Sequence, residues 1–144
     1  MNWSYYESIL LALMIWREAR ADGEPGMRAV GHVAMNRSRQ DKSSLVRVIT
    51  LDAQFTSINP PKKTYDPQLD VWPLPLDNSF TDAMTIANVI IGGQSKDPTG
   101  GATFYWNPKT SQPGCWYDVN IAKNPAYELT AMIGGHDFHK RLDS

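Results

Sequence analysis

Apolar residues recur with helical spacing near the start of the chain and predict a long first helix. Its apolar run extends from Ile9 to Trp16, and Ser4 followed by Glu7 is typical of an N-terminal capping box. We expect this helix to end near residues 21–23. Because apolar residues cover most of its circumference, we expect it to lie at the centre of the core.

Three more helices are predicted further along the chain. Pro25 suits the first helical position of a second helix that reaches about Arg37. Gly31 lies inside this helix, and because glycine costs a helix about 0.5–1 kcal/mol relative to alanine, we expect it to be needed for packing. A short third helix is predicted from Ser44 to Ile49. A fourth begins at Asp77 or Asn78 and is stopped by Gly92-Gly93.

The remaining segments predict loops and a small amount of strand. Residues 52–75 contain several prolines and predict a long loop of a kind that is often functional. Ala102 to Trp106 is predicted as a short aromatic strand. Residues 129–133 and 136–139 flank Gly134-Gly135, which is typical of a β-hairpin, while a helix over residues 125–132 is the alternative. The chain is therefore predicted to be mainly α with a small β element (α+β), as a single domain over residues 1–144.

The amino-acid composition argues against several classes of binding partner. The 144 residues are 42% apolar, which suffices to form a core, and the formal net charge is −1 with acids and bases interspersed. This balance argues against binding to nucleic acid. The single cysteine, Cys115, allows no internal disulfide. The longest apolar stretch is much shorter than the roughly 20 residues that span a bilayer, so we expect no membrane insertion and no export signal in this chain.

Glu18 is the first candidate for chemistry. It follows Leu11, Met14 and Ile15 at spacings of seven, four and three, so it continues an apolar stripe of the first helix. A partly desolvated carboxyl group can stay protonated near neutral pH, as a general acid must. The alternative is a glutamate at a helix end that pairs with Arg17 or Arg20.

Several motifs carry a resemblance to a known family. The segment from Trp16 to Arg37 resembles the signature of the SleB-like cell-wall hydrolases, E-A-R-G-E-x-x-x-G-x-x-A-V-x-x-V-x-x-N-R. We place the E-A-R-G-E part over residues 18–24 with two extra residues, so we expect a turn of different shape there. Gln54-Phe55 and residues 99–108 and 133–138 are similar to the family's Q-F, D-P-T-x-G-A-x-x-F/Y-x-N-P and I-G-x-H-x-F segments, in the same order.

The resemblance implies a lysozyme-like fold and cleavage of peptidoglycan between N-acetylmuramic acid and N-acetylglucosamine. It also implies that Glu18 is the catalytic acid of a lytic transglycosylase, which leaves 1,6-anhydro ends. Such a route needs one protein carboxylate, whereas hydrolytic glycosidases normally use two. Glu24 is the candidate for a second carboxylate in a hydrolytic muramidase, and it is equally suited to cap the second helix.

Aromatic and amide side chains are candidates for sugar binding. On a strand, Tyr105 and Asn107 would share one face while Phe104 and Trp106 share the other, and we expect the first pair to line the cleft and the second to enter the core. Phe55 is expected to anchor the long loop in the core. The candidate substrate-binding residues are Glu24, Asn36, Gln54, Tyr105, Trp106, Asn107 and Trp116.

Other functional classes find less support in the sequence. A zinc amidase or peptidase would depend on His136 and His139, which would point to opposite faces of a hairpin. A cysteine peptidase would depend on Cys115, which does not begin a helix. A non-catalytic glycan-binding module would leave Glu18 unexplained. We therefore expect no metal or cofactor, a monomer that acts on bacterial peptidoglycan, and release to the wall as a phage endolysin or virion protein, or else as a domain of an exported enzyme.

Overall fold

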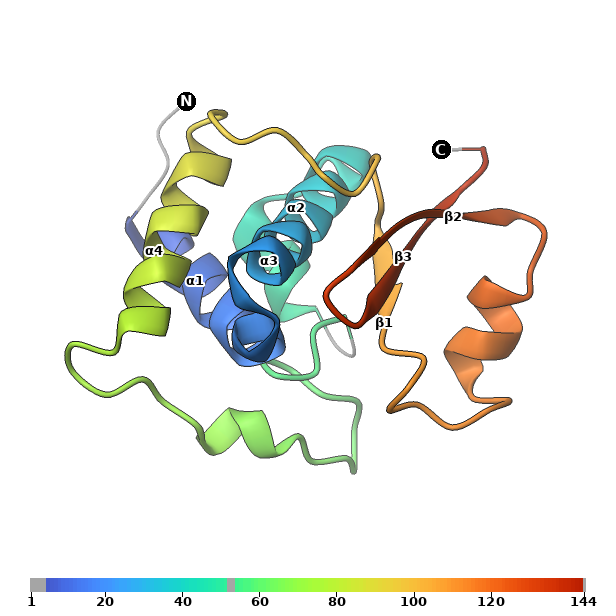
Figure 1. Ribbon diagram of the computed structural model, residues 1–144, viewed down its shortest axis with the longest axis horizontal. Coiled ribbons are helices and arrows are strands. Elements are labelled where there is room, and N and C mark those ends of the chain that lie inside the picture. Colours follow the sequence, from blue (N-terminus) through green and yellow to red (C-terminus); the bar gives the residue numbers. More distant parts are fainter. Residues whose placement is uncertain (1–4, 52–53, 144) are drawn as a thin grey trace.

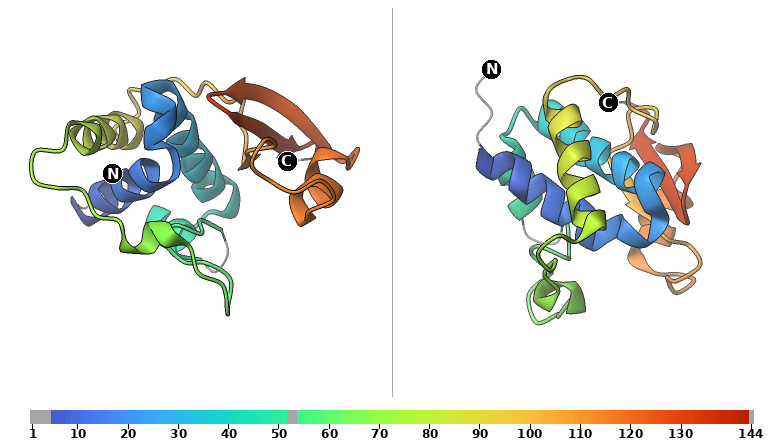
Figure 2. Two further views of the ribbon diagram at one scale, coloured as in Figure 1. Left: turned by 60° about the horizontal axis from the view of Figure 1, so that its bottom comes forward. Right: turned by 60° about the vertical axis from the view of Figure 1, so that its left-hand side comes forward.

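The computed structural model describes residues 5–51 and 54–143 (Figure 1). The four α-helices of the described residues gather on one side of the molecule, and the small sheet lies on the other, as two further views show (Figure 2). The expectation of a mainly α protein with a small β element is confirmed. The principal elements are α1 (Tyr5–Ala19), α2 (Gly23–Asp41), α3 (Leu45–Thr50), α4 (Asn78–Ile91), β1 (Phe104–Trp106), β2 (Tyr127–Ile133) and β3 (His136–Arg141).

The central position of α1 is confirmed by its contacts with both α2 and α4. Leu11, Met14 and Ile15 are fully buried. A Cβ atom on Gly31 of α2 would lie 2.9 Å from Cδ1 of Ile15 and 2.6 Å from Cδ1 of Ile90. Gly31 therefore lets α2 pack closely against α1 and α4, as expected. The predicted capping residue Ser4 lies outside the described residues.

The junction between α1 and α2 differs from the expectation. After Ala19 the chain forms a short 3₁₀ turn (Arg20–Asp22), and α2 begins at Gly23 with Asp22 in the capping position. Glu24 is thus inside the first turn of α2, so the expectation that it caps the helix is wrong. The Asp22 side chain makes no capping hydrogen bond either, because its carboxylate is engaged elsewhere.

The other helix ends follow the local sequence. Ser44 caps α3 by accepting from the Arg47 amide, and Asp77 caps α4 by accepting from the amides of Ser79 and Phe80. Both caps agree with the predicted starts. The α2 helix continues beyond Arg37 to Asp41, because nothing in that polar stretch breaks a helix.

The sheet is antiparallel with strand order β1-β3-β2, so β1 lies at an edge. The predicted hairpin is confirmed, and Gly134 occupies the left-handed region at its turn with φ of 58°. The helical alternative for residues 125–132 is wrong, since β2 pairs with β3 from Tyr127 opposite Arg141 to Ile133 opposite His136. Tyr105 of β1 packs against the helical core and also against the smaller cluster around Phe138.

The described part of the segment between α3 and α4 is largely irregular, as expected for a loop, and contains a 3₁₀ turn (Pro67–Asp70). Phe55 is completely buried and anchors this loop in the core, which confirms its expected role. A single-turn π-helix (Asp118–Ala122) beyond β1 was not predicted. No helix in the described part of the chain is long and apolar enough to cross a membrane.

Candidate functional site

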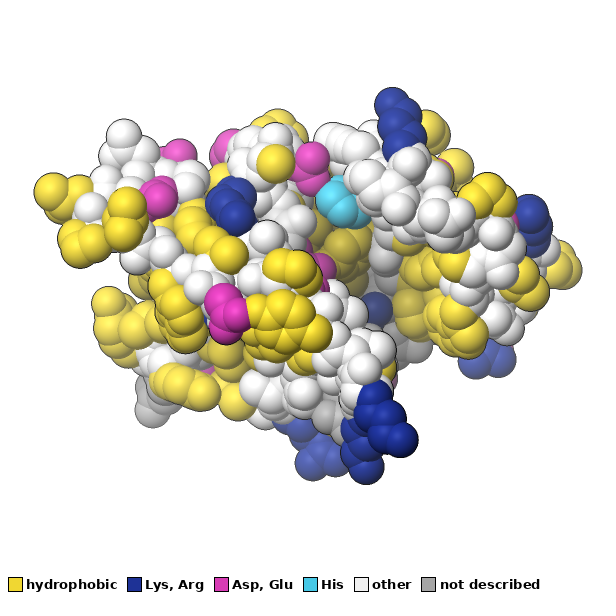
Figure 3. All heavy atoms as spheres, turned by 90° about the horizontal axis from the view of Figure 1, so that it is seen from below, with side chains coloured by type: hydrophobic (Ala, Val, Ile, Leu, Met, Phe, Trp, Pro, Cys, Tyr) yellow, Lys and Arg dark blue, Asp and Glu magenta, His cyan; other side chains and the backbone are white. Residues whose placement is uncertain are grey.

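Glu18 lies in the last turn of α1 at the wall of a cleft of about 690 Å³. The cleft runs between the helical side and the sheet side, and the space-filling view shows it as a hollow with hydrophobic side chains along it (Figure 3). Its walls come from α1, α2, the long loop, β1 and the segment that follows β1. Glu18 is the one carboxylate among the described residues that line this cleft.

Both carboxylate oxygens of Glu18 accept hydrogen bonds. The Tyr105 hydroxyl donates to Oε1, and the Ser57 backbone amide donates to Oε2 at 3.3 Å. Within the described residues no ion pair involves Glu18, because Arg17 and Arg20 both donate to other acceptors. The alternative in which Glu18 pairs with one of these arginines is therefore wrong.

Arg17 holds the long loop against the helix. Its guanidinium donates to the carbonyls of Ser57 at 3.0 Å, Leu69 at 3.2 Å and Val71 at 3.1 Å. The side chain is 6% exposed, and the Trp72 ring lies 4.4 Å from the guanidinium carbon. Arg17 thus fixes the residue whose amide contacts Glu18.

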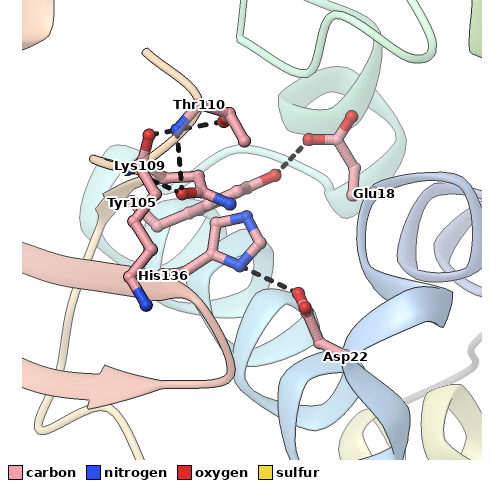
Figure 4. Close-up of polar contacts among 7 residues, drawn as sticks. Glu18, Asp22, Tyr105, Lys109, Thr110 and His136 are labelled. Carbon is pink, nitrogen blue, oxygen red and sulfur yellow. Dashed lines mark hydrogen bonds and ion pairs between the residues drawn. The ribbon is translucent and has the colours of Figure 1, made fainter.

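Tyr105 connects Glu18 to the sheet. Its ring packs against Phe55 and Phe138 with centroid separations of 6.5 and 5.8 Å. Burial and the adjacent carboxylate of Glu18 raise the pKa of Tyr105 well above its ordinary value. The phenol therefore stays protonated and remains a donor to Glu18 across the physiological pH range (Figure 4).

All four residues from Phe104 to Asn107 line the cleft, so the expectation that Phe104 and Trp106 would enter the core is wrong. The physical reason is that β1 is a three-residue edge strand, partly exposed along its length. Trp106 stacks on Tyr117 with a centroid separation of 5.0 Å and an angle of 12° between the rings. Asn107 accepts hydrogen bonds from the amides of Lys109 and Thr110 and so shapes the turn after the strand.

The far wall of the cleft carries Trp116, whose side chain is 68% exposed, and Tyr117. Gln54 also lines the cleft and accepts a hydrogen bond from Arg37 at 2.8 Å. Arg37, which the sequence reasoning did not single out, lies over the ring of Phe55 at 5.0 Å and brings a positive charge to the wall.

Two candidate residues do not line the cleft. Asn36 donates to Asp97 Oδ2 and to the Ala102 carbonyl, both at 2.9 Å, which ties α2 to the segment before β1. Glu24 is half-exposed and forms an ion pair with Arg28 on the same helix. The structure therefore gives each of them a structural partner outside the cleft.

Asp22, rather than Glu24, is the acidic residue that immediately precedes α2 and contacts the sheet. Its Oδ2 lies 3.0 Å from Nδ1 of His136, at the start of β3 (Figure 4). The family signature fits residues 18–37 without any insertion, because Gly26 and the following small and apolar positions then match in register. Its second acid falls on Asp22, so the expectation of two extra residues is wrong. Reading the pattern without a gap would have identified this residue.

The histidines have separate partners. His136 pairs with Asp22, whereas Nδ1 of His139 lies 3.0 Å from the Tyr117 hydroxyl. In residues 5–51 and 54–143 no group of three or more histidine, cysteine or acidic side chains is arranged to hold a metal ion.

Comparisons with known proteins identify the family and the fold. Residues 21–139 match the family model described as cell wall hydrolase. The fold is similar to the catalytic domain of the germination-specific lytic transglycosylase SleB from Bacillus anthracis, with a TM-score of 0.70, 24% identity and coverage of 96% of this chain and 98% of that one. It is also similar to the catalytic domain of the Bacillus cereus SleB protein, with a TM-score of 0.65, 22% identity and coverage of 96% and 93%. No curated protein sequence matches the chain. These structural matches confirm the expected fold.

Proposed function

Because this chain belongs to the cell wall hydrolase family, we propose that it cleaves the glycan strand of peptidoglycan between N-acetylmuramic acid and N-acetylglucosamine, as a lytic transglycosylase. One observation carries the proposal. Among the described residues, Glu18 is the single carboxylate in the cleft, and a phenol that stays protonated donates to it. A hydrolytic glycosidase would need a second carboxylate about 5–9.5 Å away to act as nucleophile or base.

Glu18 would act first as an acid and then as a base. The protonated carboxyl group gives its proton to the glycosidic oxygen, and the bond from that oxygen to C1 of the muramic acid breaks. The resulting carboxylate then takes the proton of the muramic acid 6-hydroxyl group while the 6-oxygen forms a bond to C1. The products are a 1,6-anhydro end and a free 4-hydroxyl group, and no water is consumed.

The hydrogen bonds of Glu18 suit both steps. Because Tyr105 and the Ser57 amide each donate to one oxygen, the proton to be transferred would occupy a free lone pair of the carboxyl group. After transfer, the phenol and the Ser57 amide both stabilise the negative carboxylate. Arg37, on the same cleft wall, adds a positive charge that favours this state.

The aromatic side chains around the cleft would bind the sugar rings. The stacked pair of Trp106 and Tyr117 and the exposed ring of Trp116 offer apolar faces, while Gln54 and Asn107 offer amide groups. Peptidoglycan strands present both kinds of surface, because each sugar has an apolar ring face and an acetamido group.

The test is mass spectrometry of the fragments that the wild type and Glu18→Gln release from purified peptidoglycan. Loss of a general acid typically lowers the rate about 100- to 10,000-fold, which is roughly 3–5 kcal/mol of barrier. We expect 1,6-anhydro ends from the wild type, and a folded variant that binds the polymer without cleaving it. The control is Glu24→Gln, which removes a carboxylate outside the cleft.

Two results would overturn the proposal. Reducing muramic acid ends would show hydrolysis by water. Near-normal turnover by Glu18→Gln would show that another group is the acid.

A further inference from the structure

Asp22 occupies a space that two glycines keep open. A Cβ atom on Gly26 would lie 2.4 Å from the Asp22 Cβ, and one on Gly134 would lie 2.9 Å from the same atom. Any side chain at either position would displace the aspartate. The start of α2 and the turn between β2 and β3 therefore meet on this residue, although more than a hundred residues of sequence separate them.

The carboxylate of Asp22 lies against the imidazole of His136. Its Oδ2 lies 3.0 Å from Nδ1, which places the two side chains in polar contact without the alignment of a hydrogen bond. Asp22 and His136 are also largely shielded from solvent, with side-chain exposures of 21% and 12%. The imidazole is thereby held in one position between the helical side and the sheet side (Figure 4).

The His136 ring packs edge-on against Tyr105. The centroids are 5.3 Å apart and the planes meet at 78°, a favourable arrangement for aromatic pairs. The hydroxyl at the other end of the Tyr105 ring donates to Glu18. A continuous series of contacts therefore runs from Asp22 through His136 and Tyr105 to Glu18. It begins and ends on the helical side.

We propose that Asp22 and His136 are positioning residues that hold the Tyr105 hydroxyl on the carboxylate of Glu18. This inference rests on the proposed function of Glu18. Tyr105 belongs to a short edge strand that, within the described residues, pairs with β3 only, so its hydroxyl needs further support to stay aligned with Glu18 of α1. The contact between Asp22 and His136 supplies that support, because it ties β3 to the residue that precedes α2.

The proposal predicts a specific kinetic signature. His136→Ala and Asp22→Ala each lower kcat about 10-fold, equal to about 1.4 kcal/mol, while KM stays within about 2-fold of the wild type. Asp22→Asn keeps the shape of the side chain and its polar contact with the imidazole, so it retains most of the rate. Glu24→Gln, two residues away and paired with Arg28, is the matched control and stays at the wild-type rate.

A double-mutant cycle distinguishes positioning from general stabilisation. Tyr105→Phe removes the hydroxyl and lowers kcat by itself. If His136 acts through that hydroxyl, adding His136→Ala to Tyr105→Phe lowers kcat no further. If the two effects multiply, or if His136→Ala matches Glu24→Gln, the proposal is wrong. Should His136→Ala fail to fold, His136→Phe, which keeps a ring against Tyr105 but cannot pair with Asp22, takes its place in the cycle.

The same series separates this inference from the proposed function. Glu18→Gln is measured alongside on the same peptidoglycan. An inactive Glu18→Gln together with fully active Asp22 and His136 variants rejects the inference alone. An active Glu18→Gln rejects both.

Discussion

Replacing Arg17 by methionine should detach the long loop from α1 while leaving the core intact. Methionine has a similar length and can fill the apolar part of the site, but it donates no hydrogen bonds. The variant loses all three bonds to the carbonyls of Ser57, Leu69 and Val71. The Ser57 amide then no longer has a fixed position beside Glu18.

The magnitude follows from the burial of those carbonyls. Hydrogen bonds to charged groups contribute about 1.5–3 kcal/mol each, so the sum has an upper limit of roughly 5–9 kcal/mol. The bonds to Leu69 and Val71 are only partly buried, and water can replace the arginine there. The bond to Ser57 is buried, and its unpaired carbonyl would cost about 1–3 kcal/mol. We therefore expect the loop to open about 5 to 150 times more often.

Hydrogen exchange measured by mass spectrometry on peptides within residues 54–72 is the direct assay. Exchange should accelerate there by that factor in Arg17→Met, with no change in the hairpin of β2 and β3, and peptidoglycan turnover should fall in parallel. Arg20→Met is the matched control, since Arg20 donates to the side chain of Gln68 and to carbonyls of α1 but not to Ser57. Unchanged exchange in Arg17→Met would refute the reasoning, because the loop would then be held by other contacts.

Two further predictions concern stability. Gly31→Ala should destabilise the protein by about 1–3 kcal/mol in urea unfolding, since the new Cβ would overlap side chains of Ile15 and Ile90; a stabilised variant would mean that those side chains can move aside. Burial opposes ionisation of Asp97, but hydrogen bonds from a neighbouring threonine and from Asn36 outweigh it and hold the pKa of Asp97 below its usual range. The stabilisation that ionised Asp97 gives the folded state is complete above its unfolded pKa of about 3.9 and is lost as the pH falls through its folded pKa. Asp97→Asn should therefore be less stable than the wild type at pH 7, and the difference in unfolding free energy should shrink below about pH 4.

Local patterns were enough to locate most elements. The starts of α3 and α4 follow from Ser44 and Asp77, whose side chains cap the adjacent amides wherever such a helix forms. The hairpin follows from Gly134-Gly135 in the same way. By contrast, the start of α2 depends on the fold, because the Asp22 carboxylate contacts His136 and does not cap the helix.

The aromatic cluster shows what local patterns cannot resolve. Alternation along β1 predicted one face in the cleft and one in the core. That rule presumes a sheet covered on one side, whereas β1 is a short edge strand and exposes parts of both faces. Trp106 therefore lines the cleft by stacking on Tyr117, a partner that lies in an irregular segment with no periodic signal.

The sequence by itself determined that Glu18 continues a buried stripe, because helical spacing is a property of the local chain. It also determined the mainly helical fold and, through its motifs, the resemblance to cell-wall hydrolases. Only the tertiary structure decided which groups surround Glu18. Tyr105, Ser57 and the pair of Asp22 with His136 are brought together by packing between segments far apart in the chain, and such contacts depend on the whole fold rather than on any local pattern.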